Sequence, residues 1–264
     1  MAHLLDGCWA KIERASESIT NLESEIQRWA QSDPPPHRIV RGLNHKKRAY
    51  TFTAFCSPVP LRISVLAGEI VHHLRSSLDH LIWALAIKRH TNPSFRIQFP
   101  ISTTSEKYLK AQKDGIMKGI SKKACDIVES LQPFKRKNPS DDPLLILEEF
   151  SNTDKHKLLL VVTNVVTMGD KISVDSGETD ANQTSIIGMS PPPETLGLTA
   201  TEGGTEVFSI LLGNYTPRFS ATLHFTLQLS LEKFGNKKNV AIVSGLAQLR
   251  DAAKSTIERF RGEF

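Results

Sequence analysis

The sequence has few of the residues and motifs that usually reveal an activity. Only three of its 264 residues are cysteines, and Cys8, Cys56 and Cys125 are far apart and form no CxxC pair. Scattered cysteines in odd number predict neither a disulfide framework nor a cysteine metal site, so reduced thiols are expected. We also find no HExxH motif, phosphate-binding glycine loop or nucleophile elbow, and we expect no metal and no cofactor.

Long apolar runs are missing as well. Residues 1–10 include Asp6 and contain no continuous apolar stretch, and the apolar segments near Val65 and at 158–166 are too short or too interrupted to cross a bilayer. The composition, with 39% hydrophobic and 23% charged residues, is that of an ordinary globular protein. The sequence therefore predicts a cytoplasmic protein with no membrane segment and with a sizeable core.

The formal net charge of +5 conceals an uneven distribution. Residues 34–137 contain 19 lysines and arginines against 6 acidic residues, whereas residues 141–232 contain 4 against 13. Clustered basic residues attract polyanions such as RNA, because binding releases counterions from the phosphates. The alternative is that these charges only cover solvated loops and helix faces.

Apolar residues spaced by three and four, bounded by prolines and capping residues, predict six helices. They are expected at 4–30, 61–90, 106–113, 122–131, 143–160 and 239–261.

Alternation with a period of two predicts strands at 49–55, 161–167, 171–174, 207–212 and 220–231. No helix separates the later strands, so antiparallel pairing is expected, and residues 176–205, rich in glycine, proline and acids, are expected to form a long mobile loop. We predict a single α+β domain over residues 1–264. It would consist of a helical bundle, about 1–160 and 238–264, with an appended antiparallel β-sheet at about 161–235.

The predicted helix at 61–90 has two different faces when its residues are projected at 100° each. One face is apolar and is expected to lie in the core: Leu66, Ile70, Leu74, Leu78, Leu81 and Leu85. The opposite face is polar around a single tryptophan: His72, His73, Arg75, Ser76, Asp79, His80 and Trp83. A large aromatic ring opposite the core is expected to pack on a partner helix, for which a second copy of the chain is suitable.

Arg75 and His80 stand in an R-x4-H spacing within the block LRSSLDHL at 74–81. This block resembles the motif of the HEPN superfamily, whose members are helical bundles that often dimerise. The resemblance implies a metal-independent endoribonuclease of the defence or toxin kind, with RNA as its substrate and an antitoxin or defence partner. It also implies that Arg75 holds phosphate charge and that His80 exchanges a proton with the 2′-hydroxyl or the leaving oxygen.

A supporting pocket is expected around this pair, containing Ser76, Asp79 and His73. The polar run at 151–157 could add three further side chains, with Asp154 orienting a histidine and Lys155 holding phosphate: Asp154, Lys155 and His156. The alternative for this run is a helix end or a solvated turn, because Ser, Asn and Asp favour caps.

A competing interpretation needs no chemistry. Asp79 lies four residues after Arg75, so an ion pair within the helix explains both residues. The protein would then be a non-catalytic dimeric binding or scaffold module that uses the same polar face. Catalysis requires Arg75 and His80 to open onto one cleft, whereas a scaffold would hold them in hydrogen bonds. The chain also resembles uncharacterised bacterial proteins that share LRSxLDH, FPI and DKH-basic blocks, found here at 74–80, 99–101 and 154–157, and that resemblance implies no activity.

Overall fold

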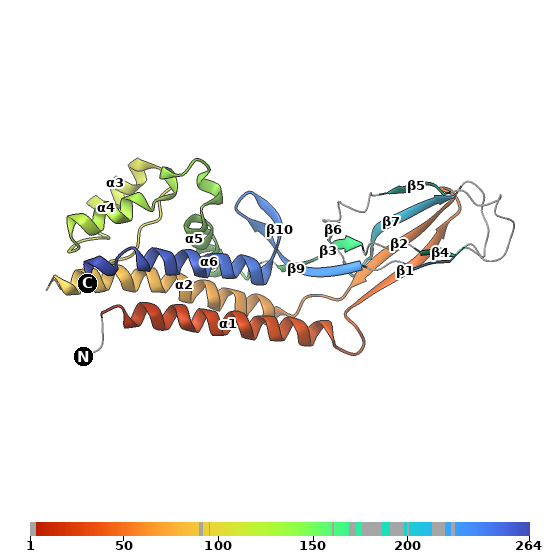
Figure 1. Cartoon of the computed structure of the whole chain (residues 1–264), viewed down its shortest axis with the longest axis horizontal. Coiled ribbons are helices and arrows are strands. Elements are labelled where there is room, and N and C mark those ends of the chain that lie inside the picture. Colours follow the sequence, from red (N-terminus) through yellow and green to blue (C-terminus); the bar gives the residue numbers. More distant parts are fainter. Residues whose placement is uncertain are drawn as a thin grey trace. The chain divides into compact units, whose positions relative to one another are not determined.

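The computed structural model of the chain describes residues 4–89, 92–94, 96–159, 161–168, 173–175, 186–190, 198–199, 201–212, 220–222 and 225–264. The chain divides into two compact units. The helical unit comprises Met1–Glu25, Leu61–Leu160 and Leu231–Phe264, and the strand unit comprises Ile26–Pro60 and Val161–Ser230. Helices and antiparallel strands are both present, which confirms the α+β class (Figure 1). The single domain over the whole chain stays a prediction.

Six α-helices lie within the described residues, as the sequence predicts: α1 (Asp6–Ala30), α2 (Leu61–Lys88), α3 (Ser105–Lys113), α4 (Lys122–Ser130), α5 (Pro143–Asp154) and α6 (Ile242–Glu258). Short 3-10 turns occur at Pro133–Lys135, Pro139–Asp141 and Arg261–Glu263. In the helical unit α2 packs on both α5 and α6, which also contact each other. Figure 1 shows α2 and α6 running lengthwise beside one another.

The helix starts follow the local signals in the sequence. Asp142 caps α5, because its carboxylate accepts the backbone N–H of Leu144 at 2.9 Å, and Pro143 occupies the first helical position. Thr104 and Ser121 cap α3 and α4 in the same way. One helix end differs from the prediction: α5 ends at Asp154 and not at residue 160, because the polar residues that follow form a turn.

The apolar stripe of α2 lies in the core of the helical unit. Its members Ile70, Leu74, Leu78 and Leu81 are fully buried, and Leu85 is 4% exposed. α6 closes this core with buried apolar residues that include Leu246, Leu249, Ala253 and Ile257. Each buried leucine stabilises the unit by about 2 kcal/mol relative to an exposed one, so this stripe fixes which way α2 is turned.

The strand unit contains an antiparallel sheet in the order β1-β2-β7-β5: β1 (His37–Asn44), β2 (Ala49–Cys56), β7 (Thr205–Leu212) and β5 (Ile186–Ser190). Alternate residues of β2 are buried on one face: Tyr50, Phe52, Ala54 and Cys56. β1 is not among the strands predicted from the sequence, and the helical part was predicted to include the whole of about 1–160. The structure instead pairs the β1–β2 hairpin with β7, far along the chain.

A second sheet has the order β10-β9-β3-β6: β10 (Lys237–Ala241), β9 (Phe225–Phe234), β3 (Val161–Met168) and β6 (Leu198–Thr199). β4 (Ser173–Asp175) and β8 (Ser220–Thr222) form a separate antiparallel pair. The predicted loop at 176–205 is wrong where β5 and β6 lie, because both strands pair with neighbours. The rest of that prediction, apart from residues 201–205, lies outside the described residues.

Candidate functional site

Arg75 is the centre of a buried polar network on α2. Its side chain is only 10% exposed, and each of its three guanidinium nitrogens has a partner. Nε donates to Glu148 of α5 at 2.7 Å, and Nη2 donates to the backbone carbonyl of Phe99 at 2.9 Å. Nη1 forms an ion pair with Asp79, one turn further along the helix. Arg75 therefore joins α2, α5 and the Phe-Pro-Ile segment.

Asp79 completes this network from the other side. Its carboxylate also accepts the backbone N–H of Phe99, at 2.9 Å. Burial raises the pKa of Asp79, although the charge of Arg75 and the two hydrogen bonds act in the opposite direction. Arg75 and Asp79 thus bind both the N–H and the C=O of Phe99, an arrangement that fixes the backbone of this residue against α2.

His80 lies apart from the guanidinium. Its side chain is exposed and faces an apolar hollow of about 460 Å³. The hollow is lined by Leu4, Gly7, Asp79, His80, Trp83, Ala84, Ile87 and Ile97. Arg75 is not among these residues, so the two members of the R-x4-H pair do not line the same hollow. Among the residues that the structure describes, Asp79 alone takes part in both the network and the hollow.

A second hollow, of about 410 Å³, collects other residues that the sequence analysis singled out. It is lined by Val65, Gly68, Glu69, His72, His73, Asp154 and Leu158. Asp154 and His73 therefore come together here, but away from His80. Glu69 and His72 stand three residues apart, a spacing that some helical metal sites use. Within the described residues, however, no group of three or more histidine, cysteine or acidic side chains could hold a metal ion.

His73 is half-buried, and its Nδ1 has no hydrogen-bond partner among the described residues. Burial lowers the pKa of His73, and the positive charges of Lys11, His72 and Arg14 lower it further, against the opposite effect of Glu69. Ser76 is half-buried beside it on α2. An imidazole in this environment is held in its neutral form.

Lys155 and His156 follow the end of α5 and are exposed. Lys155 donates from Nζ to the side-chain oxygen of Asn152 at 3.1 Å. Neither residue lines the hollow that contains His80 or the one that contains Asp154. The expected pocket is thus divided over the surface of the helical unit.

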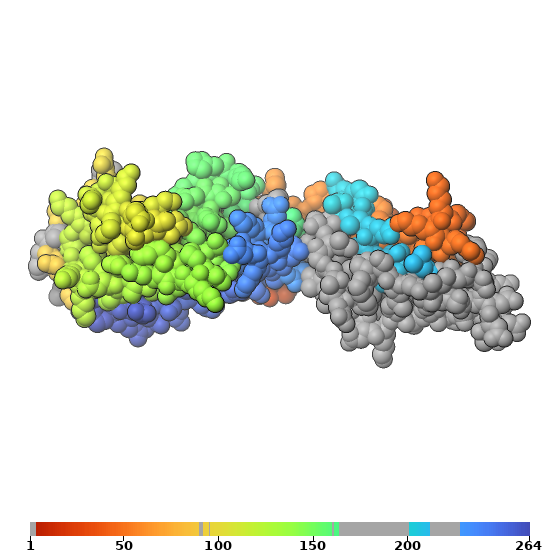
Figure 2. Space-filling model, turned by 90° about the horizontal axis from the view of Figure 1, so that it is seen from above, coloured from red at the N-terminus to blue at the C-terminus, as the bar shows by residue number. Residues whose placement is uncertain are grey.

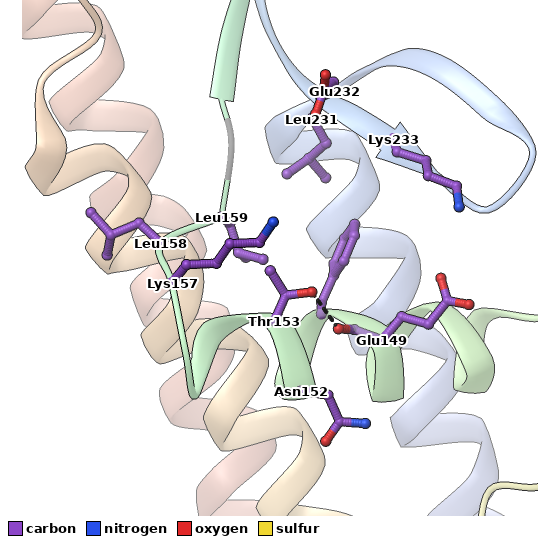
Figure 3. A pocket seen from close by; sticks show the side chains of 10 residues that line it. Glu149, Asn152, Thr153, Lys157, Leu158, Leu159, Leu231, Glu232 and Lys233 are labelled. Atoms are coloured by element: carbon purple, nitrogen blue, oxygen red, sulfur yellow. Dashed lines mark hydrogen bonds between the residues drawn. The ribbon is translucent and has the colours of Figure 1, made fainter.

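A third hollow, of about 610 Å³, lies between the end of α5 and β9 and was not predicted from the sequence (Figure 3). Its lining includes two basic and two acidic side chains: Lys157, Lys233, Glu149 and Glu232. Thr153 donates its hydroxyl to the backbone carbonyl of Glu149 at 2.8 Å. No sequence signal could have identified this hollow, because its two halves lie more than 70 residues apart.

Scans against family models and searches of curated proteins and solved structures find no match to this chain. Among the described residues, no helix is both long and apolar enough to span a bilayer. The resemblance to the HEPN superfamily and the cytoplasmic location stay predictions.

Proposed function

We propose that this protein is a non-catalytic binding module that forms a homodimer through the exposed face of α2. A row of eight side chains carries the proposal, and we call it the α2 stripe: Leu61, Val65, Glu69, His72, Ser76, His80, Trp83 and Ile87. Successive members are four, four and three residues apart, and this spacing repeats. A period of 3.67 residues keeps such a row on one side of a nearly straight helix.

Both ends of the α2 stripe are apolar and face solvent in the single chain. Leu61 is 71% exposed and Val65 42%, and at the other end Trp83 is 44% exposed and Ile87 36%. Leu4, 43% exposed, extends the second end across the hollow. Exposed apolar side chains grouped in this way are typical of association surfaces.

The order of residues along the stripe suits a second copy that runs in the opposite direction. With a twofold axis between His72 and Ser76, Leu61 meets the partner's Ile87, and Val65 meets the partner's Trp83. Glu69 then meets the partner's His80, which places a carboxylate opposite an imidazole. An isologous interface requires this self-complementarity, because the same patch must serve both subunits. The apolar contacts supply affinity and the polar pairs fix the register.

The network around Arg75 supports a structural role for Arg75 and Asp79 within the single chain. A guanidinium that already binds two carboxylates and a carbonyl has little capacity left for a phosphate. Its contacts hold α5 and Phe99 on α2 and leave the α2 stripe exposed beside them.

Sedimentation measurements over a range of concentrations test the dimer. The wild-type protein is expected to approach twice its 29.4 kDa mass, and Trp83→Glu is expected to remain monomeric because it places a charge against the partner's Val65. Glu69→Lys is expected to weaken association. The double variant Glu69→Lys with His80→Glu is expected to restore it, since the lysine introduced at position 69 then stands opposite a glutamate of the partner.

Leu109→Glu is the matched control, because Leu109 lies on α3, away from the α2 stripe, and is 52% exposed. It should dimerise like the wild type. A wild-type protein that stays monomeric at about 100 μM, where an association free energy of about −5.5 kcal/mol suffices for half-dimerisation, contradicts the proposal. A double variant no better than Glu69→Lys contradicts the antiparallel register.

A second candidate is the HEPN-like endoribonuclease, favoured by the exposed imidazole of His80 beside Asp79 at one hollow. Its test is the cleavage of total RNA by the wild-type protein and by His80→Ala, with and without a metal chelator. Chelator-resistant cleavage that His80→Ala loses supports a nuclease of the defence or toxin kind. Equal activity of both proteins, or none from either, counts against it.

A further inference from the structure

The β1–β2 hairpin of the strand unit carries a concentrated positive charge. We call its five basic residues the basic edge: Arg38, Arg41, Lys46, Lys47 and Arg48. All five are exposed, and the sequence contains no acidic residue between positions 34 and 68. β1 is the first strand in the order of its sheet, so its outer side has no paired strand among the described residues. In Figure 2 the hairpin (orange) stands at the surface beside β7 (cyan).

The backbone conformation of the hairpin turn gives no reason for a basic residue at position 48. Arg48 has a φ of 50°, a left-handed conformation that glycine or asparagine adopts more easily. Glu206 of β7 lies 3.9 Å from Lys47 at the turn, in an exposed ion pair. Such an exposed pair contributes little, so Lys47 keeps most of its charge available to a polyanion.

A hollow of about 350 Å³ adjoins the start of β1. Its lining combines apolar, cationic and acidic groups: Pro34, Pro35, His37, Arg38, Phe55 and Glu202, with Pro36, Cys56 and Ser57 completing it. The guanidinium of Arg38 lies 4.3 Å from the ring centroid of Phe55, in a stacked cation–π contact. A planar guanidinium on an aromatic ring, next to a carboxylate, offers a nucleobase a stacking surface and a hydrogen-bond acceptor.

We propose that the basic edge and this hollow together bind single-stranded nucleic acid. The phosphates lie along β1 and the turn, and one unpaired base enters the hollow beside Arg38 and Phe55. β1 is about 26 Å long at 3.3 Å per residue, which matches a binding site of several nucleotides. An acidic peptide would use the same charges but not the stacking surface, and a duplex would keep its bases out of the hollow.

Fluorescence anisotropy with a labelled single-stranded RNA of about 16 nucleotides, measured at several salt concentrations, tests the proposal. The double variant Lys46→Gln with Arg48→Gln is expected to reduce the slope of log Kd against log salt by about 1.4, because two phosphate contacts are lost. Arg38→Lys keeps the charge and loses the planar group, so it should weaken binding about fivefold with the slope unchanged.

The matched control removes two exposed lysines from the helical unit, Lys122→Gln with Lys137→Gln, and should keep wild-type affinity and slope. Circular dichroism confirms that each variant is folded. Equal binding by the control and by the double variant of the basic edge overturns the proposal, and so does a wild-type protein that fails to bind at about 10 μM. Competition by polyglutamate as effective as that by RNA, or equal affinity for duplex RNA, overturns the assignment to single strands.

Discussion

Arg75 is the residue whose environment most limits what the helical unit can do. Its single positive charge is shared between two acidic side chains, Asp79 and Glu148, that are 33% and 27% exposed. Removing the arginine leaves the carboxylates without a counter-charge in a partly buried environment. The loss in free energy of unfolding is then larger than the net contribution of the intact ion pairs. A substitution of Arg75 is therefore expected to lower the stability of the protein, so a loss of activity in such a variant would not by itself show a catalytic role.

We therefore expect Arg75→Met to lower the free energy of unfolding by about 3 kcal/mol. Urea denaturation followed by the helical circular dichroism signal measures it. The control is Arg14→Met, which breaks the ion pair with Glu17 between side chains more than half exposed and should change stability by less than about 0.5 kcal/mol. Equal unfolding midpoints for Arg75→Met and the wild type would contradict a structural role for this network.

His73 makes stability depend on pH. Its pKa in the folded protein is lower than the ordinary value of 6.5, so the unfolded chain takes up the proton first as the pH falls. The stability contributed by the neutral imidazole is complete above 6.5 and is lost as the pH falls from there towards the lower folded pKa.

We expect the thermal unfolding midpoint of the wild type to fall between about pH 7.5 and pH 5.5, and His73→Gln to show a smaller fall. Scanning calorimetry at a series of pH values measures the difference. His156→Gln, in the exposed turn after α5, serves as the control and should follow the wild type. Identical pH profiles for His73→Gln and the wild type would show that this group does not titrate differently on folding.

At the scale of elements, the side chain of Asp154 at the end of α5 lies against a glycine of α2. A Cβ atom placed on Gly68 would lie 2.6 Å from the carboxyl carbon of Asp154. Asp154 is the last residue of α5, and the absence of a side chain at position 68 leaves room for its carboxylate beside α2. This contact gives Asp154 a packing role that the sequence analysis did not foresee.

We expect Gly68→Ala to gain less than the roughly 1 kcal/mol that alanine gains over glycine in an open helix position, because the carboxylate of Asp154 must move aside. Asp154→Ala should remove the clash. The double variant Gly68→Ala with Asp154→Ala should therefore be more stable than Asp154→Ala alone by up to about 1 kcal/mol. Urea denaturation of the four proteins completes the cycle, and additive effects would contradict the contact.

The helices were predictable from the sequence because their signals are local. Asp142 with Pro143 marks the start of α5, and the leucines of α2 mark its buried face. β1 was not predictable in this way: Ile39 and Val40 are adjacent, so its apolar residues do not alternate. Its partner strand β2 alternates regularly, and pairing with that strand is what makes β1 extended.

The candidate site shows the same limit. The ion pair of Arg75 with Asp79 follows from a spacing of four residues, and the sequence predicts it. Glu148 and Phe99 lie 73 and 24 residues from Arg75, and no pattern in the sequence connects them. Because these distant partners decide whether the guanidinium is available, the sequence could place Arg75 on the helix but could not establish its role.

At the scale of the whole molecule, the two compact units carry the two proposed surfaces separately. The α2 stripe belongs to the helical unit and the basic edge to the strand unit. The chain passes between the units several times, and for this reason the sequence analysis assigned 26–60 to the helical part. A homodimer would contain two basic edges, which are linked through the paired helices.

Linked binding sites give a test that needs both surfaces. An RNA long enough to reach both basic edges of a dimer binds its second site at a raised effective concentration, whereas a short one engages a single site. We expect Trp83→Glu to weaken binding of an RNA of about 60 nucleotides by tenfold or more and to leave an RNA of about 12 nucleotides unaffected. Leu109→Glu should bind both RNAs as the wild type does. Anisotropy titrations of the three proteins measure this, and an equal loss for both lengths would mean that Trp83 acts on RNA directly and not through the dimer.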